Sequence, residues 1–174
     1  MADVQIKDQA LRAVPEGTDQ IAVDDAAGAT WRVVLSTLYQ VLGIGYVLHA
    51  LCAPSSPADG TTYYLGSTWG LVLVTTAGLQ RIYIPRSGTV TRVDITTVNV
   101  TNNGSSETSS IYLRLNSATD TLLTSSFRSD NQYFNITGLS VAVTAGDFIE
   151  IKWVSPTWAT NPVGLIISAQ IYVA

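Results

Sequence analysis

The chain has 174 residues, of which 47% are apolar and only 13% are charged, so it can build a core and is not intrinsically disordered. Its net charge of −4 is concentrated in residues 1–59, which hold seven acidic and three basic residues, whereas residues 60–174 hold six of each. Neither part has the basic surface that phosphate backbones require, which excludes nucleic acid as an expected partner.

The N-terminus lacks the pattern of a secretory signal because Asp3, Lys7 and Asp8 interrupt it. The longest apolar run, residues 41–51, is about half the length of a membrane span. We therefore expect synthesis in a cytoplasm and no membrane partner.

Residues 1–40 form the first predicted module. Residues 20–23 and 30–34 alternate in hydrophobicity on either side of an Asp- and Gly-containing turn, which predicts a small β-hairpin. Ser36 is a plausible N-cap for a short helix over residues 37–42. A unit this small buries too little surface to be stable alone, so we expect it to fold against a partner.

Three runs within this module form a recurring pattern. An I-x-D start lies in residues 4–8, a G-T-D-x-I-x-V strand in residues 16–25, and a T-x-x-V-x-L return in residues 30–36. The pattern resembles the N-terminal attachment segment of tailed-bacteriophage appendage and decoration proteins. This resemblance covers about the first 40 residues and implies a virion protein. The attachment residues that it implies are Val4, Ile6, Asp8, Ile21, Val23, Trp31 and Val33.

Residues 41–60 are predicted to connect this module to the rest of the chain. The apolar run in this segment suits a buried strand or an interface segment, and residues 53–60 form a linker rich in turn residues. His49 is interpreted as a packed histidine, because no second ligand has the spacing of a metal site. Cys52, the single cysteine, is interpreted as a small buried hydrophobe rather than a reactive thiol or an intermolecular bridge.

From residue 61 onward the pattern predicts an all-β domain, residues 61–174, with the architecture of a jelly-roll-like antiparallel β-sandwich. The predicted strands cover residues 61–65, 72–75, 80–84, 89–101, 109–116, 132–137, 141–143, 148–154 and 164–173. Val93 and Ile95 share an alternation phase that Val98 and Val100 do not, which predicts a β-bulge at residues 96–97.

Residues 139–154 predict an antiparallel hairpin, with apolar residues alternating on both sides of a turn that contains Gly146 and Asp147. The L-x-V-x-V-x-x-G-D-x-I-x-I phrase in it is similar to one in jelly-roll phage tips, tumour-necrosis-factor-like trimers and carbohydrate-binding sandwiches. The similarity implies a fold more than a function. A last strand that runs to the end of the chain also suits a trimeric sandwich.

An enzymatic reading has little support in the sequence. The chain has one histidine, one cysteine, no phosphate-binding glycine loop and no nucleophile elbow, so we expect no catalytic residue, no metal and no cofactor. Asp94 and Glu150 are candidates for a glycosidase pair, but their alternating strands favour an interpretation as residues of a solvated outer face. Asp120, Asp130 and Asp147 are weaker candidates for binding Ca²⁺.

Trp158, in the loop of residues 155–160, is the best candidate for an exposed aromatic that contacts a distal ligand. The function expected from these observations is a non-enzymatic capsid decoration or cement protein. It would be a homotrimer bound to the major capsid protein on the head surface of a virion. The alternative is a receptor-binding tip or adaptor of the tail that touches a tail component and a host glycan.

Overall fold

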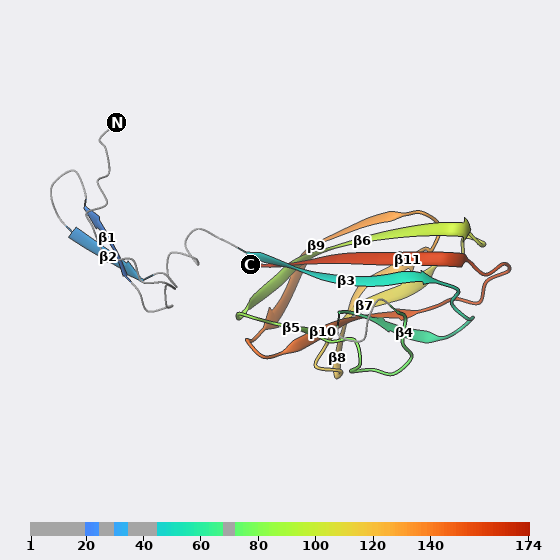
Figure 1. Ribbon diagram of the computed structural model, residues 1–174, viewed down its shortest axis with the longest axis horizontal. Coiled ribbons are helices and arrows are strands. Elements are labelled where there is room, and N and C mark those ends of the chain that lie inside the picture. The colour runs from blue at the N-terminus through green and yellow to red at the C-terminus, as the bar shows by residue number, and fades with distance from the viewer. Residues whose placement is uncertain (1–19, 25–29, 35–44, 68–71) are drawn as a thin grey trace, which may run out of the picture. The chain divides into compact units, whose positions relative to one another are not determined.

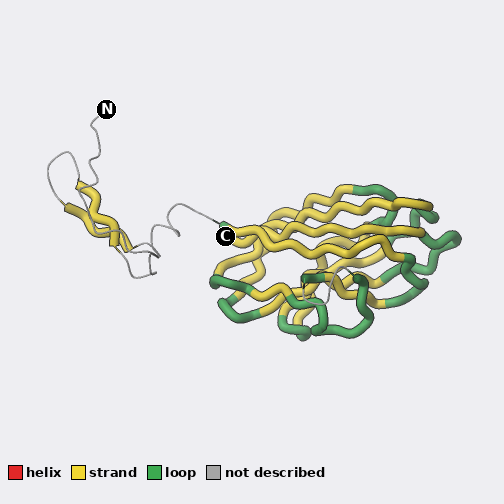
Figure 2. Tube along the Cα trace, in the orientation of Figure 1, coloured by secondary structure: helices red, strands yellow, loops and turns green. Residues whose placement is uncertain are grey.

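The computed structural model describes residues 20–24, 30–34, 45–67 and 72–174, with side chains from residue 45 onward. The chain divides into two units, Met1–Ile44 and Gly45–Ala174. Every regular element of the described residues is a strand (Figures 1 and 2). The helix predicted over residues 37–42 lies outside the described residues.

The first unit contains a two-stranded antiparallel sheet, β1 (Gln20–Asp24) and β2 (Thr30–Val34). Gln20 lies opposite Val34, and Asp24 lies opposite Thr30. The predicted hairpin is therefore confirmed.

The second unit is a sandwich of two antiparallel sheets. Its strands are β3 (Tyr46–Ser55), β4 (Thr62–Leu65), β5 (Ile82–Tyr83), β6 (Gly88–Asn102), β7 (Ser109–Leu115), β8 (Thr119–Phe127), β9 (Tyr133–Val143), β10 (Phe148–Val154) and β11 (Val163–Val173). One sheet has the order β3-β11-β6-β9, and the other has the order β4-β10-β7-β8 with β5 added beside β10 (Figure 1).

The strand order is that of a jelly roll. Strand β3 pairs with β11, β4 with β10, β6 with β9, and β7 with β8, so the chain folds as a long ribbon whose strands pair from the outside inward. The predicted fold class, an all-β jelly-roll-like sandwich, is confirmed.

The predicted connector, residues 41–60, is wrong in part because residues 46–55 form β3 and belong to the sandwich. Ala50 and Cys52 on this strand are fully buried, and β3 pairs with β11 from Tyr46 to Ser55. Pro54 is tolerated because β3 is an edge strand and an edge strand leaves some amides without a ladder partner.

Three other strand predictions differ from the structure. Strand β8 was missed because its apolar residues do not alternate: Leu122 is exposed, and Leu123 beside it is buried. Strand β9 is continuous where two strands were expected, with Gly138 at a φ of 73° beside a register shift. The strand expected at residues 72–75 is a single bridge between Tyr64 and Val74.

The β-bulge predicted at residues 96–97 is also wrong. Thr97 is buried and keeps the inward phase of Val93 and Ile95, whereas Val98 and Val100 point outward. The irregularities of β6 lie on either side, near Val90 and beyond residue 99. The sequence argument failed because it assumed that every valine faces the core.

The core between the sheets is centred on Trp153, which is fully buried. Its ring contacts those of Tyr63, Phe127 and Trp158 at centroid distances of 5.7, 5.7 and 5.9 Å. Its indole N–H donates to Ser109 Oγ at 2.9 Å, so the ring brings no unpaired polar atom into the core.

The antiparallel hairpin predicted over residues 139–154 is wrong in its pairing. A turn joins β9 to β10, but β9 pairs with β6 in one sheet, and β10 pairs with β4, β5 and β7 in the other, so the chain crosses between the sheets here. Gly146 has a φ of 92°, a conformation that favours glycine. Asp147 closes the turn because its Oδ2 accepts from the Thr144 amide at 2.8 Å. Hydrogen bonds from the Asn116 side chain and from that amide lower the pKa of Asp147.

Candidate functional site

The predicted attachment residues that the structure describes occupy one face of the two-stranded sheet. Ile21 lies opposite Val33, and Val23 lies opposite Trp31. Because alternate positions of a strand share a face, these four residues lie on one side, and Ala22 and Arg32 lie on the other. Val4, Ile6 and Asp8 lie outside the described residues.

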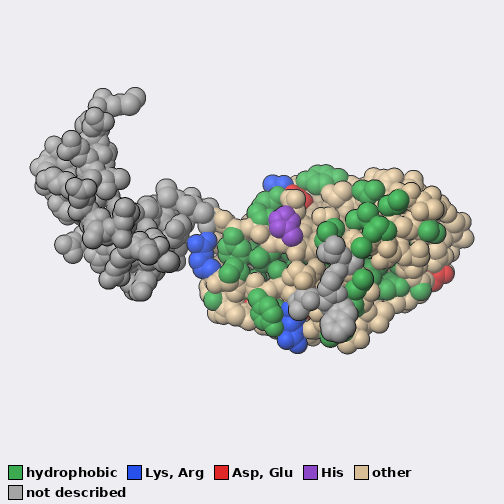
Figure 3. Space-filling view, viewed as in Figure 1, with side chains coloured by type: hydrophobic (Ala, Val, Ile, Leu, Met, Phe, Trp, Pro, Cys, Tyr) green, Lys and Arg blue, Asp and Glu red, His purple; other side chains and the backbone are tan. Residues whose placement is uncertain are grey.

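The outer face of the β3-β11-β6-β9 sheet carries exposed apolar side chains. Figure 3 shows hydrophobic side chains scattered among polar ones over the visible side of the jelly roll. Val98 and Val100 of β6 are 45% and 63% exposed, and Tyr133 of β9 is 61% exposed. Ile166 of β11 lies opposite Val98. Leu51 of β3 lies across β11 from Thr96, the residue that pairs with Tyr133. We call these five residues, Leu51, Val98, Val100, Tyr133 and Ile166, the apolar patch.

A polar cluster lies next to the apolar patch, and its side chains are hydrogen-bonded to one another. Arg92 donates to Asp94 from two guanidinium nitrogens, and Asn135 Nδ2 donates to Asp94 Oδ1 at 2.6 Å. The guanidinium lies 4.5 Å from the ring centroid of Tyr172, whose hydroxyl donates to Gln170 at 2.9 Å. The hydrogen bonds from Arg92 hold the pKa of Asp94 below its usual value.

Part of the outer face of the second sheet, at β10, is covered by the chain itself. Glu150 of β10 points outward but is fully buried, because its Oε1 accepts from the amides of Gly78 and Gln80 at 2.8 and 3.3 Å. Its Oε2 accepts from Ser117 Oγ at 3.1 Å. The described part of the loop between β4 and β5 is thereby held against the sheet.

These two carboxylates were interpreted as parts of a solvated face, and that interpretation is wrong. Asp94 is nearly buried, and Glu150 is completely buried. They also belong to different sheets and face away from each other across the sandwich, so they cannot flank one bond.

The three aspartates that were candidates for Ca²⁺ binding each have different hydrogen-bond or ion-pair partners. Asp120 accepts from Lys152 Nζ at 2.5 Å and from Arg114 at 2.6 Å. Partial burial alone would raise its pKa, but these two cations lower it. Asp130 pairs with Arg128, and Asp147 belongs to the β9–β10 turn. No group of three acidic, histidine or cysteine side chains in the described part of the chain could hold a metal ion.

Trp158 is not the exposed aromatic that the sequence suggested. It is only 5% exposed, and its ring stands edge-on to Trp153. Its loop is tied down by Asp59, which accepts from the Trp158 amide at 3.4 Å and from the Asn161 side chain at 2.9 Å. The indole closes the end of the core. Its burial excludes Trp158 as a residue that contacts a distal ligand.

His49 is exposed rather than packed, because the alternation of β3 turns Ala50 and Cys52 inward and His49 outward. Cys52 is buried, as predicted. Its sulfur accepts from the Ile167 amide at 3.2 Å, at the register shift between β3 and β11. Burial raises the pKa of this thiol to about 11, which keeps it protonated and unreactive at neutral pH.

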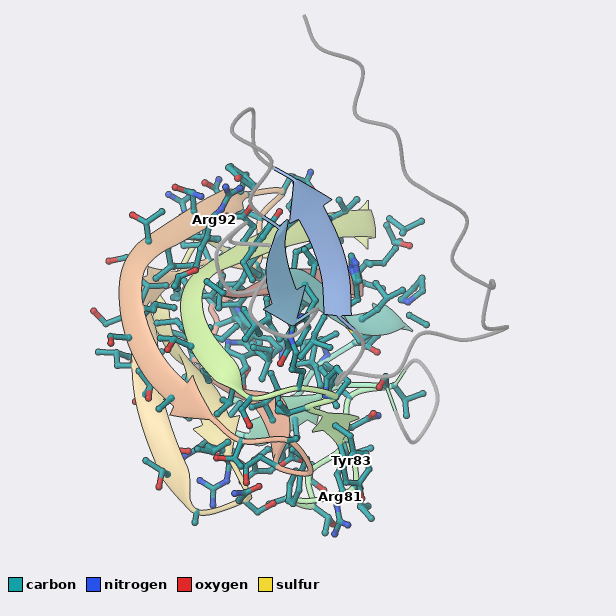
Figure 4. All side chains as sticks on the ribbon, turned by 90° about the vertical axis from the view of Figure 1, so that its left-hand side faces the viewer. Arg81, Tyr83 and Arg92 are labelled. Atoms are coloured by element: carbon teal, nitrogen blue, oxygen red, sulfur yellow. The ribbon has the colours of Figure 1, made fainter. Side chains whose placement is uncertain are left out.

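A smaller cluster lies at the edge of the second sheet. The Arg81 guanidinium lies 4.7 Å from the Phe148 ring centroid and donates to the Tyr83 hydroxyl at 3.2 Å. Figure 4 shows Arg81 and Tyr83 on one side of the sandwich and Arg92 on the other. Both of these contacts of Arg81 are made with residues of its own chain.

Sequence reasoning missed the apolar patch. The signal for it is the change of alternation phase between Ile95 and Val98. This change reflects two valines, Val98 and Val100, that face outward, and not the predicted bulge.

No known protein-family model matches this chain, and no curated protein matches it. Among the described residues, no helix is long and apolar enough to span a membrane.

Proposed function

We propose that this chain is a non-enzymatic structural protein of a tailed-phage virion, a decoration or cement protein that binds the major capsid protein as a homotrimer on the head surface. The observation that carries the proposal is the N-terminal sheet. Four residues of the attachment pattern, Ile21, Val23, Trp31 and Val33, share one face of it. This sheet belongs to a unit separate from the jelly roll.

A two-stranded sheet is marginal in water and needs a surface that covers its apolar face. The jelly roll, in contrast, has its own closed core. The small unit requires a partner, so it is suited to anchoring the protein. The larger unit requires none, so it is suited to forming the exposed part of the anchored protein.

The carboxylates of the jelly roll support a structural role for it. Glu150 fastens a loop, Asp94 is paired with Arg92 and Asn135, and Asp120 is shared between Lys152 and Arg114. Each of these acidic groups is occupied by partners from its own chain.

The test compares the binding of full-length variants to particles that lack the protein. Val33→Asp places a charge on the face of the attachment residues and should abolish binding, whereas Ala22→Asp places the same charge on the opposite face and should bind like the wild type. Far-UV circular dichroism and the melting temperature of the jelly roll should be the same in both variants. Equal binding of the two variants would contradict attachment through this face.

The second candidate is a tail adaptor or receptor-binding tip. The observation that favours it is the loop end of the jelly roll, where Asn131 donates to Asn103 at 3.2 Å and Ser105 Oγ donates to the Thr160 carbonyl at 3.1 Å. Such a rigid, polar surface suits contact with a glycan. Labelling of intact virions separates the candidates, because a decoration protein covers the head in proportion to its shell protein and a tail component is found only at the tail.

A further inference from the structure

The two outer faces of the jelly roll differ in what covers them. The outer face of the β4-β10-β7-β8 sheet carries the buried Glu150 beneath a loop, and Tyr64 exchanges backbone hydrogen bonds of 2.8 and 3.3 Å with Val74 of that loop. In the apolar patch on the other sheet, Val98, Val100 and Tyr133 are exposed, and Leu51 and Ile166 are half-buried. Exposed apolar side chains that lie near one another on a sheet mark a candidate interaction site.

The charge of this face decides which kind of partner fits it. Its charged residues on the central strands, Arg92 and Asp94, are bonded to each other, and Asn135 donates to the same carboxylate. His49 lies at the β3 edge. A partner with a strongly charged surface would therefore find no complementary charge. A second copy of the same face brings an equally neutral surface, and the two faces do not repel each other.

The size of the face is sufficient for such a contact. Four strands about 4.8 Å apart and about ten residues long, at about 3.3 Å per residue, cover roughly 600 Å². Two such faces would bury roughly 1,200 Å² in total, which reaches the range of specific protein interfaces. The side chains of sheets packed face to face interdigitate as those of the sandwich interior do.

We infer that copies of this chain associate through the outer face of the β3-β11-β6-β9 sheet, with the apolar patch at the centre of the interface. The inference goes beyond the homotrimer of the proposed function, because two identical faces packed against each other pair protomers about a twofold axis. The loop-covered face of the other sheet then stays at the periphery of the assembly. An isologous contact of this kind uses the same patch on both protomers, whereas the contacts within a cyclic trimer join two different surfaces.

The experiment measures the mass of the full-length chain by sedimentation equilibrium at micromolar concentration. Val98→Lys combined with Val100→Lys should raise the dissociation constant roughly hundredfold or more, because each interface would bury unpaired ammonium groups. The matched control is Leu122→Lys. Leu122 is 51% exposed and lies on β8 of the other sheet, so this control should leave the mass unchanged.

A gentler pair of substitutions guards against a loss of folding. Val98→Thr with Val100→Thr keeps β-branched residues, which suit an exposed strand, and removes part of the apolar surface. It should weaken association by a smaller factor, with an unchanged circular dichroism spectrum.

Three results would overturn the inference. A monomeric wild type would remove both this interface and the trimer of the proposed function. A wild-type oligomer that resists the lysine pair but is dissociated by Leu122→Lys would keep the oligomer and move its interface to the other sheet. An oligomer that resists both would place the interface outside the two sheet faces, whereas particle binding of the Val33→Asp variant tests attachment separately.

Discussion

The two outer faces of the jelly roll are built from the same alternating strands, but their outward side chains differ in burial. On the β4-β10-β7-β8 sheet, outward-facing Glu150 is buried by backbone amides of a loop, and Lys152 and Arg114 share Asp120. On the β3-β11-β6-β9 sheet, Val98 and Val100 are exposed beside a self-contained polar cluster. One face is thus partly covered by its own chain, whereas apolar side chains of the other face are exposed among the described residues.

This difference shows that a polar residue at an outward position does not identify a solvated surface. Glu150 would look like a surface residue by its position alone, yet it is the anchor of a loop. The valines of β6 would look like core residues, yet they form the apolar surface. Four experiments test this difference between the two faces.

The largest effect is expected for Glu150→Ala. Removal of the carboxylate leaves the amides of Gly78 and Gln80 and the hydroxyl of Ser117 without their acceptor in a buried position. Unsatisfied buried groups of this kind should lower the free energy of unfolding by about 3 kcal/mol. Urea denaturation measures this loss. Glu150→Gln, which keeps one acceptor oxygen, should lose less, and equal stability of Glu150→Ala and wild type would show that the loop is held by other contacts.

A smaller effect is expected for Gly78→Ala on the covering loop. Gly78 has a φ of 78°, and an added Cβ would lie 3.1 Å from Ser117 Oγ. A left-handed conformation at a residue other than glycine costs about 1 kcal/mol. Thermal unfolding should show a lower melting temperature, while Gly60→Ala provides a control with the same sign of φ and no neighbouring atom within 4 Å. A larger loss at Gly60 would contradict the account of a close approach at Gly78.

The third experiment uses pH to test the polar cluster of the exposed face. The pKa of Asp94 is lowered in the folded state, so its contribution to stability is fully present above the unfolded value of about 3.9 and is lost as pH falls through the folded pKa. Asp94→Asn should therefore flatten the loss of stability below about pH 4, and at neutral pH it should cost about 1 kcal/mol or less. Unfolding curves from pH 6 to lower pH check both statements. An unaltered pH dependence in Asp94→Asn would mean that other carboxylates control acid unfolding.

The smallest effect on folding is expected for Val98→Thr, measured on protein diluted until it is monomeric. Val98 is 45% exposed, and threonine is equally suited to a strand, so the free energy of unfolding should change by about 0.5 kcal/mol or less. Val93→Thr on the inward face of the same strand buries a hydroxyl and should cost clearly more. If the two substitutions were equally destabilising, Val98 would not be an outward-facing residue.

Much of the architecture was predictable from local patterns. The turn at Gly146 and Asp147 follows from its turn residues, and the strand at residues 148–154 has the bounds that alternation predicts. The expected pairing of the two strands beside this turn was wrong, because β9 and β10 belong to opposite sheets. Strand β8 was not predictable in the same way, because exposed Leu122 and buried Leu123 are adjacent and conceal the alternation. Edge strands bury fewer residues and therefore carry a weaker signal.

The sequence by itself determined that the chain folds as an antiparallel jelly-roll-like sandwich preceded by a small hairpin, because alternation and turn residues act over a few neighbouring positions. Only the tertiary structure decided which side of each strand meets the core and what covers the other side. Trp158 is buried by Trp153 of β10, and Glu150 is buried by the loop near Gly78. The period of a strand divides its residues between two faces, but the surroundings of each face are supplied by distant segments of the chain.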